Sequence, residues 1–116
     1  MISPIPNKVY RAVAALDDKR AVNIKALDLS EVSSSLSYFV IATGESQLQL
    51  KAMQDSVKEQ LKAQGETLLG VEGPAERWVL MDYGDMVVHM MSQEAREFYD
   101  LEGLWADARQ IEIDLT

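Results

Sequence analysis

The chain has 116 residues, no cysteine, and 19 acidic against 11 basic side chains, which gives a formal net charge of −8. A chain of this length buries about two thirds of the surface that its unfolded form exposes, enough for one core without disulfides or a structural metal. The missing cysteines exclude disulfide scaffolds, thiolate zinc sites, iron–sulfur clusters and cysteine nucleophiles.

The negative charge is concentrated in one part of the chain. Seven of the eight net charges lie between Glu72 and Asp107, whereas residues 1–71 carry equal numbers of acidic and basic side chains. Binding of DNA or RNA relies mainly on Lys and Arg that neutralise phosphates, so we expect little direct contact with nucleic acid. A basic protein is the better-matched partner. The alternative is that these carboxylates form ordinary solvated faces of a small domain.

Targeting and membrane signals are missing from the sequence. Residues 1–6 (MISPIP) lack the basic and apolar regions of a secretory signal, and no apolar run approaches the roughly 18 residues of a membrane span. We therefore expect a cytoplasmic protein without a membrane contact.

The first elements are a helix and two strands. Asn7 is the expected N-cap of a helix over residues 8–16. Residues 24–29 alternate as in a short strand. The apolar, β-branched and aromatic run over residues 38–42 predicts a strand that is covered on both faces.

A second helix has clear signals at both ends. Ser46 and Gln49 have the spacing of a capping box, which predicts a helix from Gln47 to about Gln64. Gly65 is expected to end it, since glycine adopts the left-handed conformation found just after a helix.

The acidic part of the chain begins with strands. Residues 67–71 are expected to form a strand and residues 72–75 a loop. Residues 77–81 and 85–91 then flank Asp-Tyr-Gly, which predicts a β-hairpin with Gly84 in its turn.

Helices follow at residues 94–100 and 101–106, with an interruption near Gly103. Residues 111–115 alternate like an edge strand, or they are disordered. The order α-β-β-α-β-β-β-α predicts an α/β fold, a mixed-sheet α/β sandwich. We expect one domain over residues 1–107 and a C-terminal tail over 108–116.

Catalytic and ligand sites have structural alternatives. The turn Thr43–Ser46 enters a helix N-terminus, which favours anions such as phosphate, but a strand-to-helix turn needs its glycine and capping serine for structural reasons alone. Asp82 and Asp85 are three apart across a turn, whereas two metal-binding carboxylates on one strand face are spaced by two. Acid–base pairs of no distinctive spacing stay open.

His89 is the single histidine, and no serine lies in the glycine-flanked elbow of a hydrolase. A hydrogen-bonded structural or surface role is expected for it. The sequence therefore predicts no catalytic residue, no metal and no cofactor.

Binding of a protein is better supported. Five of the eight aromatic residues lie within the acidic part of the chain, and apolar anchors ringed by charge are typical of protein contacts. The alternative is that most of these aromatic residues belong to the core. On the strand over residues 77–81, Trp78 and Leu80 share one face and Val79 and Met81 the other. Both faces are apolar, so one is expected to meet helices and the other a helix, a second copy or a partner.

An ordered string of motifs along residues 8–107 closely resembles the ribosomal silencing factor family, also called RsfS or Iojap. The matching segments are Leu27-Asp28, residues 38–44 (YFVIATG), Ser46, residues 70–73 (GVEG), residues 78–85 (WVLMDYGD), residues 87–89 (VVH), residues 94–102 (EAREFYDLE) and Leu104-Trp105. The whole string is far more specific than any one of its motifs.

The resemblance implies a protein that is not an enzyme and that binds the large ribosomal subunit through its ribosomal protein fourteen. Such binding blocks joining of the small subunit and represses translation when nutrients are limited. The resemblance also implies a nucleotidyltransferase-like fold without the paired carboxylates of that superfamily, and a homodimer as in other members.

The matched positions give the expected contact residues. The apolar anchor and its neighbours are Trp78, Leu80, Met81, Tyr83 and Met90, and the acidic partners are Glu72, Asp82, Asp85 and Glu94. The matched residues Arg96, Glu97, Tyr99 and Asp100 either hold the last helix on the sheet or contact the partner. Two other functions stay open: a nucleotide-binding, nucleotidyltransferase-like enzyme that uses the Gly44–Ser46 turn, and a dimeric adaptor with another target.

Overall fold

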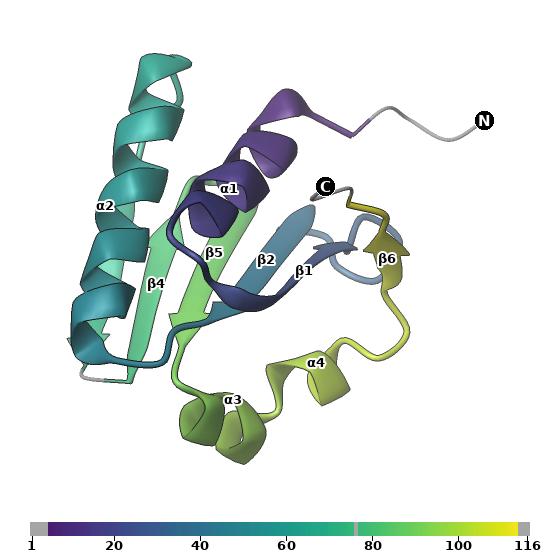
Figure 1. Cartoon of the computed structure of the whole chain (residues 1–116). Coiled ribbons are helices and arrows are strands. Elements are labelled where there is room, and N and C mark those ends of the chain that lie inside the picture. Colours follow the sequence, from purple (N-terminus) through teal and green to yellow (C-terminus); the bar gives the residue numbers. More distant parts are fainter. Residues whose placement is uncertain (1–4, 76, 114–116) are drawn as a thin grey trace.

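The computed structural model describes residues 5–75 and 77–113. Figure 1 shows a sheet with helices on its two sides. The elements in chain order are α1 (Asn7–Asp18), β1 (Val22–Asp28), β2 (Tyr38–Thr43), α2 (Gln47–Ala63), β3 (Gly70–Ala75), β4 (Trp78–Asp82), β5 (Met86–Met91), α3 (Gln93–Tyr99), α4 (Leu101–Leu104) and β6 (Arg109–Ile111).

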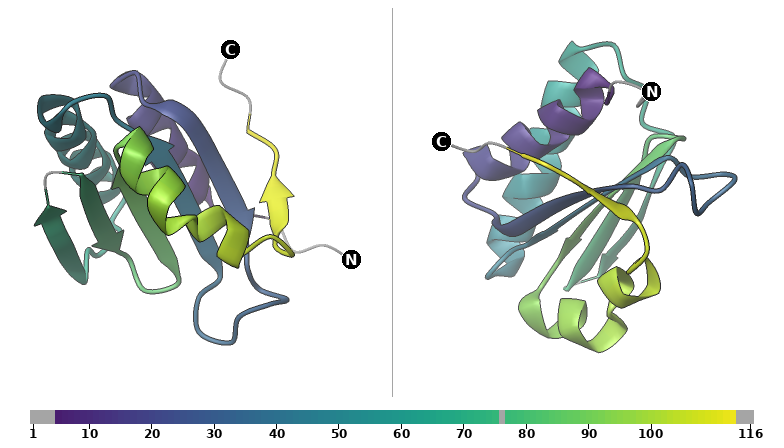
Figure 2. Two further views of the ribbon diagram at one scale, coloured as in Figure 1. Left: turned by 90° about the horizontal axis from the view of Figure 1, so that it is seen from below. Right: turned by 90° about the vertical axis from the view of Figure 1, so that its right-hand side faces the viewer.

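The sheet is mixed, as the sequence predicts. Its six strands have the order β3-β4-β5-β2-β1-β6. The central pair, β2 and β5, is parallel, and the other neighbours are antiparallel. β2 is followed by α2 on one face and β5 by α3 on the other, so the two chain segments leave the centre of the sheet in opposite directions (Figure 2).

The two faces of the sheet carry cores of unequal size. The larger core packs α1 and α2 against the first face, and it includes Val40 and Ala42 of β2. The smaller core lies under α3 and α4 and includes Phe39 and Ile41 of the same strand. β2 is therefore covered on both faces, which confirms the prediction from its continuous apolar run.

Local capping signals are confirmed for α2 and wrong for α1. Ser46 Oγ accepts a hydrogen bond from the Gln49 backbone N–H at 3.0 Å, and Gly65 follows the helix with φ +82°. Gln49 Oε1 completes the cap on the N–H of Glu45 at 2.6 Å rather than on that of Ser46. At α1 the N-cap residue is Pro6 without a side-chain cap, and Asn7 is already helical because the Val9 N–H donates to the Pro6 carbonyl.

The loop predicted at residues 72–75 is part of β3. Gly73 has φ +85°, and the pairing with β4 shifts register between Glu72 and Ala75. A bulge of this kind admits turn-forming residues into an edge strand without ending it. The predicted hairpin of β4 and β5 is confirmed, and Gly84 has φ +90° in its turn.

The break between the last two helices falls at Asp100, where the sequence divides them, but the interruption expected near Gly103 is wrong, because Gly103 lies within α4. Asp100 has φ +45°, and its side chain accepts from the Gly103 N–H at 3.2 Å, so it ends α3 and caps α4. Residues 109–111 then form β6, which pairs with β1 and buries Ile111. These residues lie in the sheet, beyond the domain boundary expected at residue 107. The rest of the predicted edge strand reaches residues 114 and 115, which lie outside the described residues.

The hydroxyl of Tyr83 predicts a stabilising substitution. Tyr83 is 6% exposed, its hydroxyl has no hydrogen-bond partner among the described residues, and burial raises its pKa to about 12. Because a buried unpaired hydroxyl costs free energy, Tyr83→Phe is expected to raise the free energy of unfolding by about 1 kcal/mol. Urea unfolding measures this, with the exposed Tyr10→Phe as control. A loss of stability in Tyr83→Phe would contradict the prediction.

Candidate protein-binding surface

β4 presents different faces to the two sides of the sheet. Val79 and Met81 are buried on the face that α2 covers, whereas Trp78 and Leu80 point to the other side and are half-buried. The smaller core includes Trp78 at its margin and does not include Leu80. In Figure 2, β3 and β4 extend past the helices of the second side. This uncovered part of the sheet is the candidate binding surface.

A shallow hollow lies on this part of the sheet. It has a volume of about 220 Å³ and is lined by Glu72, Gly73, Trp78 and Leu80. The pairing of β3 with β4 sets Glu72 directly opposite Leu80, so the two side chains share one face. The hollow thus brings together three of the predicted contact residues, Glu72, Trp78 and Leu80.

A row of rings runs from the smaller core to the surface. Ring centroids are separated by 4.7 Å between Phe39 and His89, 5.8 Å between His89 and Trp78, 4.7 Å between Trp78 and Tyr99, and 5.0 Å between Tyr99 and Phe98. Phe39 is 1% exposed and Phe98 is 80% exposed. The row therefore extends the hollow onto α3, and we call Glu72, Gly73, Trp78, Leu80, Phe98 and Tyr99 together the Trp78 surface.

Phe98 is missing from the predicted contact residues, and for Tyr99 the sequence leaves a structural role and a partner contact open. The sequence shows that both residues belong to the acidic part of the chain that is rich in aromatic residues. It does not show which side chain is exposed, because this depends on how α3 packs on the sheet. Adjacent helix residues point about 100° apart, so two neighbouring aromatic residues on a short helix indicate that at least one is exposed.

His89 is the hydrogen-bond partner of the Trp78 indole. The Trp78 Nε1–H donates a hydrogen bond to His89 Nδ1 at 3.0 Å, and the histidine is 7% exposed. Burial lowers the pKa of His89 to about 4, so its ring is neutral at pH 7. Nδ1 accepts, so the proton resides on Nε2. This confirms the expected hydrogen-bonded structural role.

The four predicted acidic contacts have different surroundings. Glu72 is exposed in the hollow. Glu94 is exposed and lies 3.6 Å from the Arg77 guanidinium. Asp82 is half-buried on the face of Trp78, and one carboxylate oxygen accepts from the Gly84 N–H at 2.8 Å in the hairpin turn. Asp85 lies in the same turn, at the end of the hairpin that is far from Trp78, and it forms an ion pair with Lys8 of α1.

Three predicted apolar contacts belong to the core. Met81 and Met90 are fully buried and Tyr83 nearly so, all three packed with α1 and α2. Strand alternation explains this correction: Met81 lies one residue from Leu80 and so points to the opposite face. None of the three side chains reaches the Trp78 surface.

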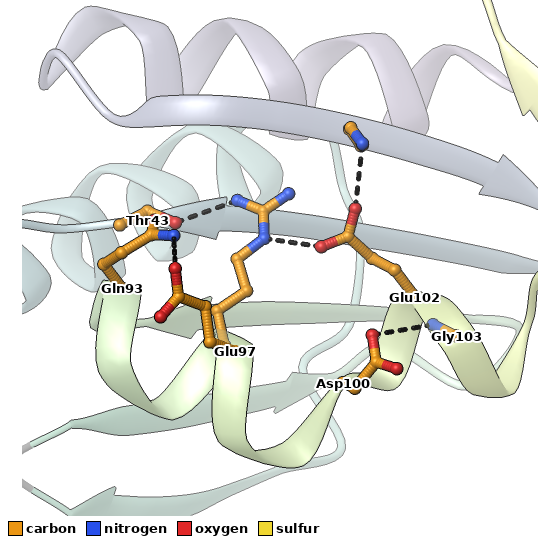
Figure 3. A network of polar contacts seen from close by, with 8 residues as sticks. Thr43, Gln93, Glu97, Asp100, Glu102 and Gly103 are labelled. Carbon is orange, nitrogen blue, oxygen red and sulfur yellow. Dashed lines mark hydrogen bonds and ion pairs between the residues drawn. The ribbon is translucent and has the colours of Figure 1, made fainter.

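Arg96 holds the second helical layer on the sheet through Thr43 and Glu102, which are labelled in Figure 3. This arginine is 6% exposed, and its guanidinium donates to Thr43 Oγ1 at 2.8 Å and to a Glu102 carboxylate oxygen at 2.7 Å. Lys25 lies 3.0 Å from the other oxygen of Glu102. The hydrogen bond from Arg96 lowers the pKa of Glu102. The network joins α3 and α4 to β2 and β1, and it thereby fixes the helix that carries Tyr99.

The Gly44–Ser46 turn has structural explanations for its residues. A Cβ on Gly44 would lie 2.7 Å from Leu50 Cδ2, and Ser46 caps α2. Among the described residues, no group of three or more histidine, cysteine, aspartate or glutamate side chains is placed to hold a metal ion. In the same part of the chain, no helix is long and apolar enough to cross a membrane.

Comparison with known proteins decides the family. Residues 3–116 match the family model described as "Ribosomal silencing factor during starvation". The chain belongs to this RsfS family. The Bacillus subtilis protein named ribosomal silencing factor RsfS is 43% identical over 104 residues, covering 89% of this chain and 88% of the relative. The RsfS of Chromobacterium violaceum is 42% identical over 95 residues, covering 81% and 78%.

Solved structures agree with the family assignment. A crystal structure of a Chromobacterium violaceum protein has a TM-score of 0.85 with 36% identity, covering 98% of this chain and 94% of that one. A more distant relative is the mouse protein named mitochondrial assembly of ribosomal large subunit protein 1, 34% identical over 97 residues, which cover 80% of this chain and 42% of the relative. The RsfS resemblance and the mixed α/β fold expected from the sequence are both confirmed.

The buried histidine predicts a pH-dependent stability. Its pKa is about 4 in the folded protein and 6.5 in the unfolded chain, so between these pH values only the unfolded chain takes up the proton. The stability that the neutral His89 allows is fully present above about pH 6.5. It is lost as the pH falls from there towards the folded-state pKa of about 4. Between pH 7 and 4.5 it is expected to reduce the free energy of unfolding by about 2 kcal/mol.

Urea unfolding at the two pH values measures this loss. His89→Asn keeps a hydrogen-bond acceptor near the position of Nδ1 and does not titrate, so its stability is expected to fall less over the same interval. Equal losses in the two proteins would show that other groups cause the pH dependence.

Proposed function

We propose that this protein is a ribosomal silencing factor that binds the large ribosomal subunit and represses translation under nutrient limitation. The support is its membership of the RsfS family over nearly the whole chain, together with close relatives that carry that name. The mouse relative is named for assembly of the large ribosomal subunit, which favours the large subunit as the target. The proposed location is the cytoplasm, where bacterial ribosomes work.

The single observation that carries the mode of binding is the uncovered sheet face around Trp78. A half-buried tryptophan beside a hollow, with exposed aromatic residues next to it, is the composition found at the centre of protein interfaces. Glu72 lines the hollow and Glu94 lies near the Trp78 end of β4, next to Arg77. Carboxylates at the rim select a basic partner more than they add affinity.

We infer that ribosomal protein fourteen, the partner implied by the family resemblance, docks on the Trp78 surface. Contacts through a ribosomal protein suit a chain whose net charge is −8, because the phosphates of ribosomal RNA repel an acidic surface. The bound protein then occupies the face where the small subunit joins and excludes it sterically. This mechanism needs no chemical step, so the protein is proposed to act without being an enzyme and without a cofactor.

Subunit joining tests the function directly. Purified large and small subunits are mixed at a magnesium concentration that favours joined ribosomes, with and without saturating protein, and separated by sedimentation. The expected result is a loss of joined ribosomes and co-sedimentation of the protein with the large subunit. Undiminished joining at saturating protein would refute the proposal. Sedimentation of the protein with the small subunit alone serves as the control, since no co-sedimentation is expected there.

Trp78→Ala tests the anchor. Removal of a central interface tryptophan is expected to weaken binding to the large subunit by at least about 2 kcal/mol, roughly 30-fold in Kd. The matched control is Leu48→Ala, which shortens an exposed apolar side chain on α2, the helix that covers the other face. Fluorescence anisotropy of labelled protein gives both Kd values, and circular dichroism shows that the variants are folded. Normal binding by folded Trp78→Ala would place the anchor elsewhere.

The oligomeric state is measured in the same experiments. We propose that the protein also forms a homodimer, as the resemblance implies. Sedimentation velocity of wild type and Trp78→Ala then shows whether a second copy uses the Trp78 surface. If it does, the dimer dissociates in the variant, and dimerisation competes with ribosome binding.

A further inference from the structure

Trp78 has a polar partner that a simple apolar anchor does not need. An indole on a solvent-facing part of a sheet can satisfy its N–H with water. Here Nε1–H instead donates at 3.0 Å to a histidine that is 7% exposed. The partner residue comes from the neighbouring strand: Leu80 of β4 is paired with His89 of β5, so the two anchor residues of β4 lie beside and diagonally across from the imidazole.

The imidazole itself is tightly held. Its ring lies 4.7 Å from that of Phe39, and β2 sets Ile41 directly beside it in the parallel register. Both β2 residues are fully or almost fully buried in the smaller core. The core of the protein therefore fixes the position of His89 Nδ1. Through the hydrogen bond, this atom restrains the Trp78 indole at the surface.

A second ring, that of Tyr99, also contacts the indole. Tyr99 packs on Trp78 with a centroid separation of 4.7 Å and an interplanar angle of 45°, and Phe98 meets Tyr99 edge-on. Tyr99 alone leaves the indole free to turn about the bond that joins it to Cβ, because an aromatic contact tolerates several orientations. The hydrogen bond to His89 selects one of them.

We propose that His89 is a positioning residue for the Trp78 anchor, holding the indole in one orientation before the protein partner arrives. The proposal rests on the proposed function, since it takes Trp78 as the anchor. Ordering a flexible side chain costs free energy at the moment of binding, and an anchor that is already ordered avoids this cost. The role requires the neutral tautomer with its proton on Nε2, because an imidazolium has donors at both nitrogens and cannot accept from the indole.

Two variants separate positioning from packing. His89→Leu keeps an apolar side chain in the core and removes the acceptor. His89→Asn keeps an acceptor near Nδ1 and has less volume. If His89 acts by packing, His89→Leu should be closer to wild type than His89→Asn. If His89 acts by accepting the hydrogen bond, His89→Asn should be closer to wild type.

The first measurement is made on the free protein. The chain has two tryptophans, so the amide spectrum of ¹⁵N-labelled protein contains two indole N–H signals, and Trp78→Phe assigns them. In wild type and His89→Asn the Trp78 signal is expected to be shifted by the hydrogen bond and protected from exchange with water. In His89→Leu the shift and the protection should be lost. An unchanged signal in His89→Leu would overturn the proposal.

The second measurement is the affinity for the large ribosomal subunit. His89→Leu is expected to bind about fivefold more weakly than wild type, the effect of one neutral hydrogen bond, and His89→Asn to restore most of the affinity. In a Trp78→Phe background, which lacks the indole N–H, the change from His89 to Leu should alter Kd by less than about twofold. An equal loss in both backgrounds would mean that His89 acts through the fold and not through Trp78.

The outcomes also distinguish this proposal from the proposed function. If folded Trp78→Ala binds like wild type, the anchor and the positioning role both fail. If Trp78→Ala loses binding while folded His89→Leu keeps it, the anchor stands and the positioning role alone is overturned.

Discussion

The buried guanidinium of Arg96 is the interaction on which the second side of the molecule depends. α3 has seven residues and α4 has four, lengths at which a helix is not stable by itself in water. Their attachment comes from a small apolar core and from a charge that is paired on two sides, with Thr43 and with Glu102. A buried charge without its partners is strongly destabilising, so the network accepts one arrangement of the two helices on the sheet.

That arrangement decides which part of the sheet stays uncovered. Of the two long helices, α2 covers the first face of β4, whereas the short helices lie over the centre and the β1 side of the second face. What remains is a margin with apolar side chains and carboxylates, backed by a rigid core. Such a margin combines two properties of a recognition surface: its tryptophan is held by a hydrogen bond and a ring contact, and its rim carries charge that favours a basic partner.

Features that depend on neighbouring residues could be predicted from the sequence. The cap at Ser46, the end at Gly65, the hairpin at Gly84 and the shared face of Trp78 and Leu80 all follow from spacing along a few residues. The family motifs identified the chain, but a contiguous motif contains residues of both strand faces, so it placed Met81 on the surface beside Leu80. The ion pair of Asp85 could not be foreseen for another reason, because its partner Lys8 is 77 residues away in the chain.

The remaining differences come from one local cap and from tertiary contacts. Gly103 has a high intrinsic tendency to break a helix, but it lies within α4, where the Asp100 side chain caps the first turn. The strand at residues 109–111 is formed because β1 has a free edge, a fact that the local pattern does not contain. The orientation of His89 beneath Trp78 likewise depends on pairing between strands that the sequence predicts only as a hairpin.

The place of β6 in the sheet has a consequence for synthesis of the chain. β6 pairs with β1, so the segment that completes this edge of the sheet is translated after all the other strands, and α3 and α4 also follow β5. The face with α1 and α2 can form while the chain is still being made, but the opposite face stays bare until these later segments emerge. Contacts between such distant segments form slowly, and exposed apolar strands are prone to aggregate. The part of the Trp78 surface that α3 contributes is thus synthesised after every strand that it packs against.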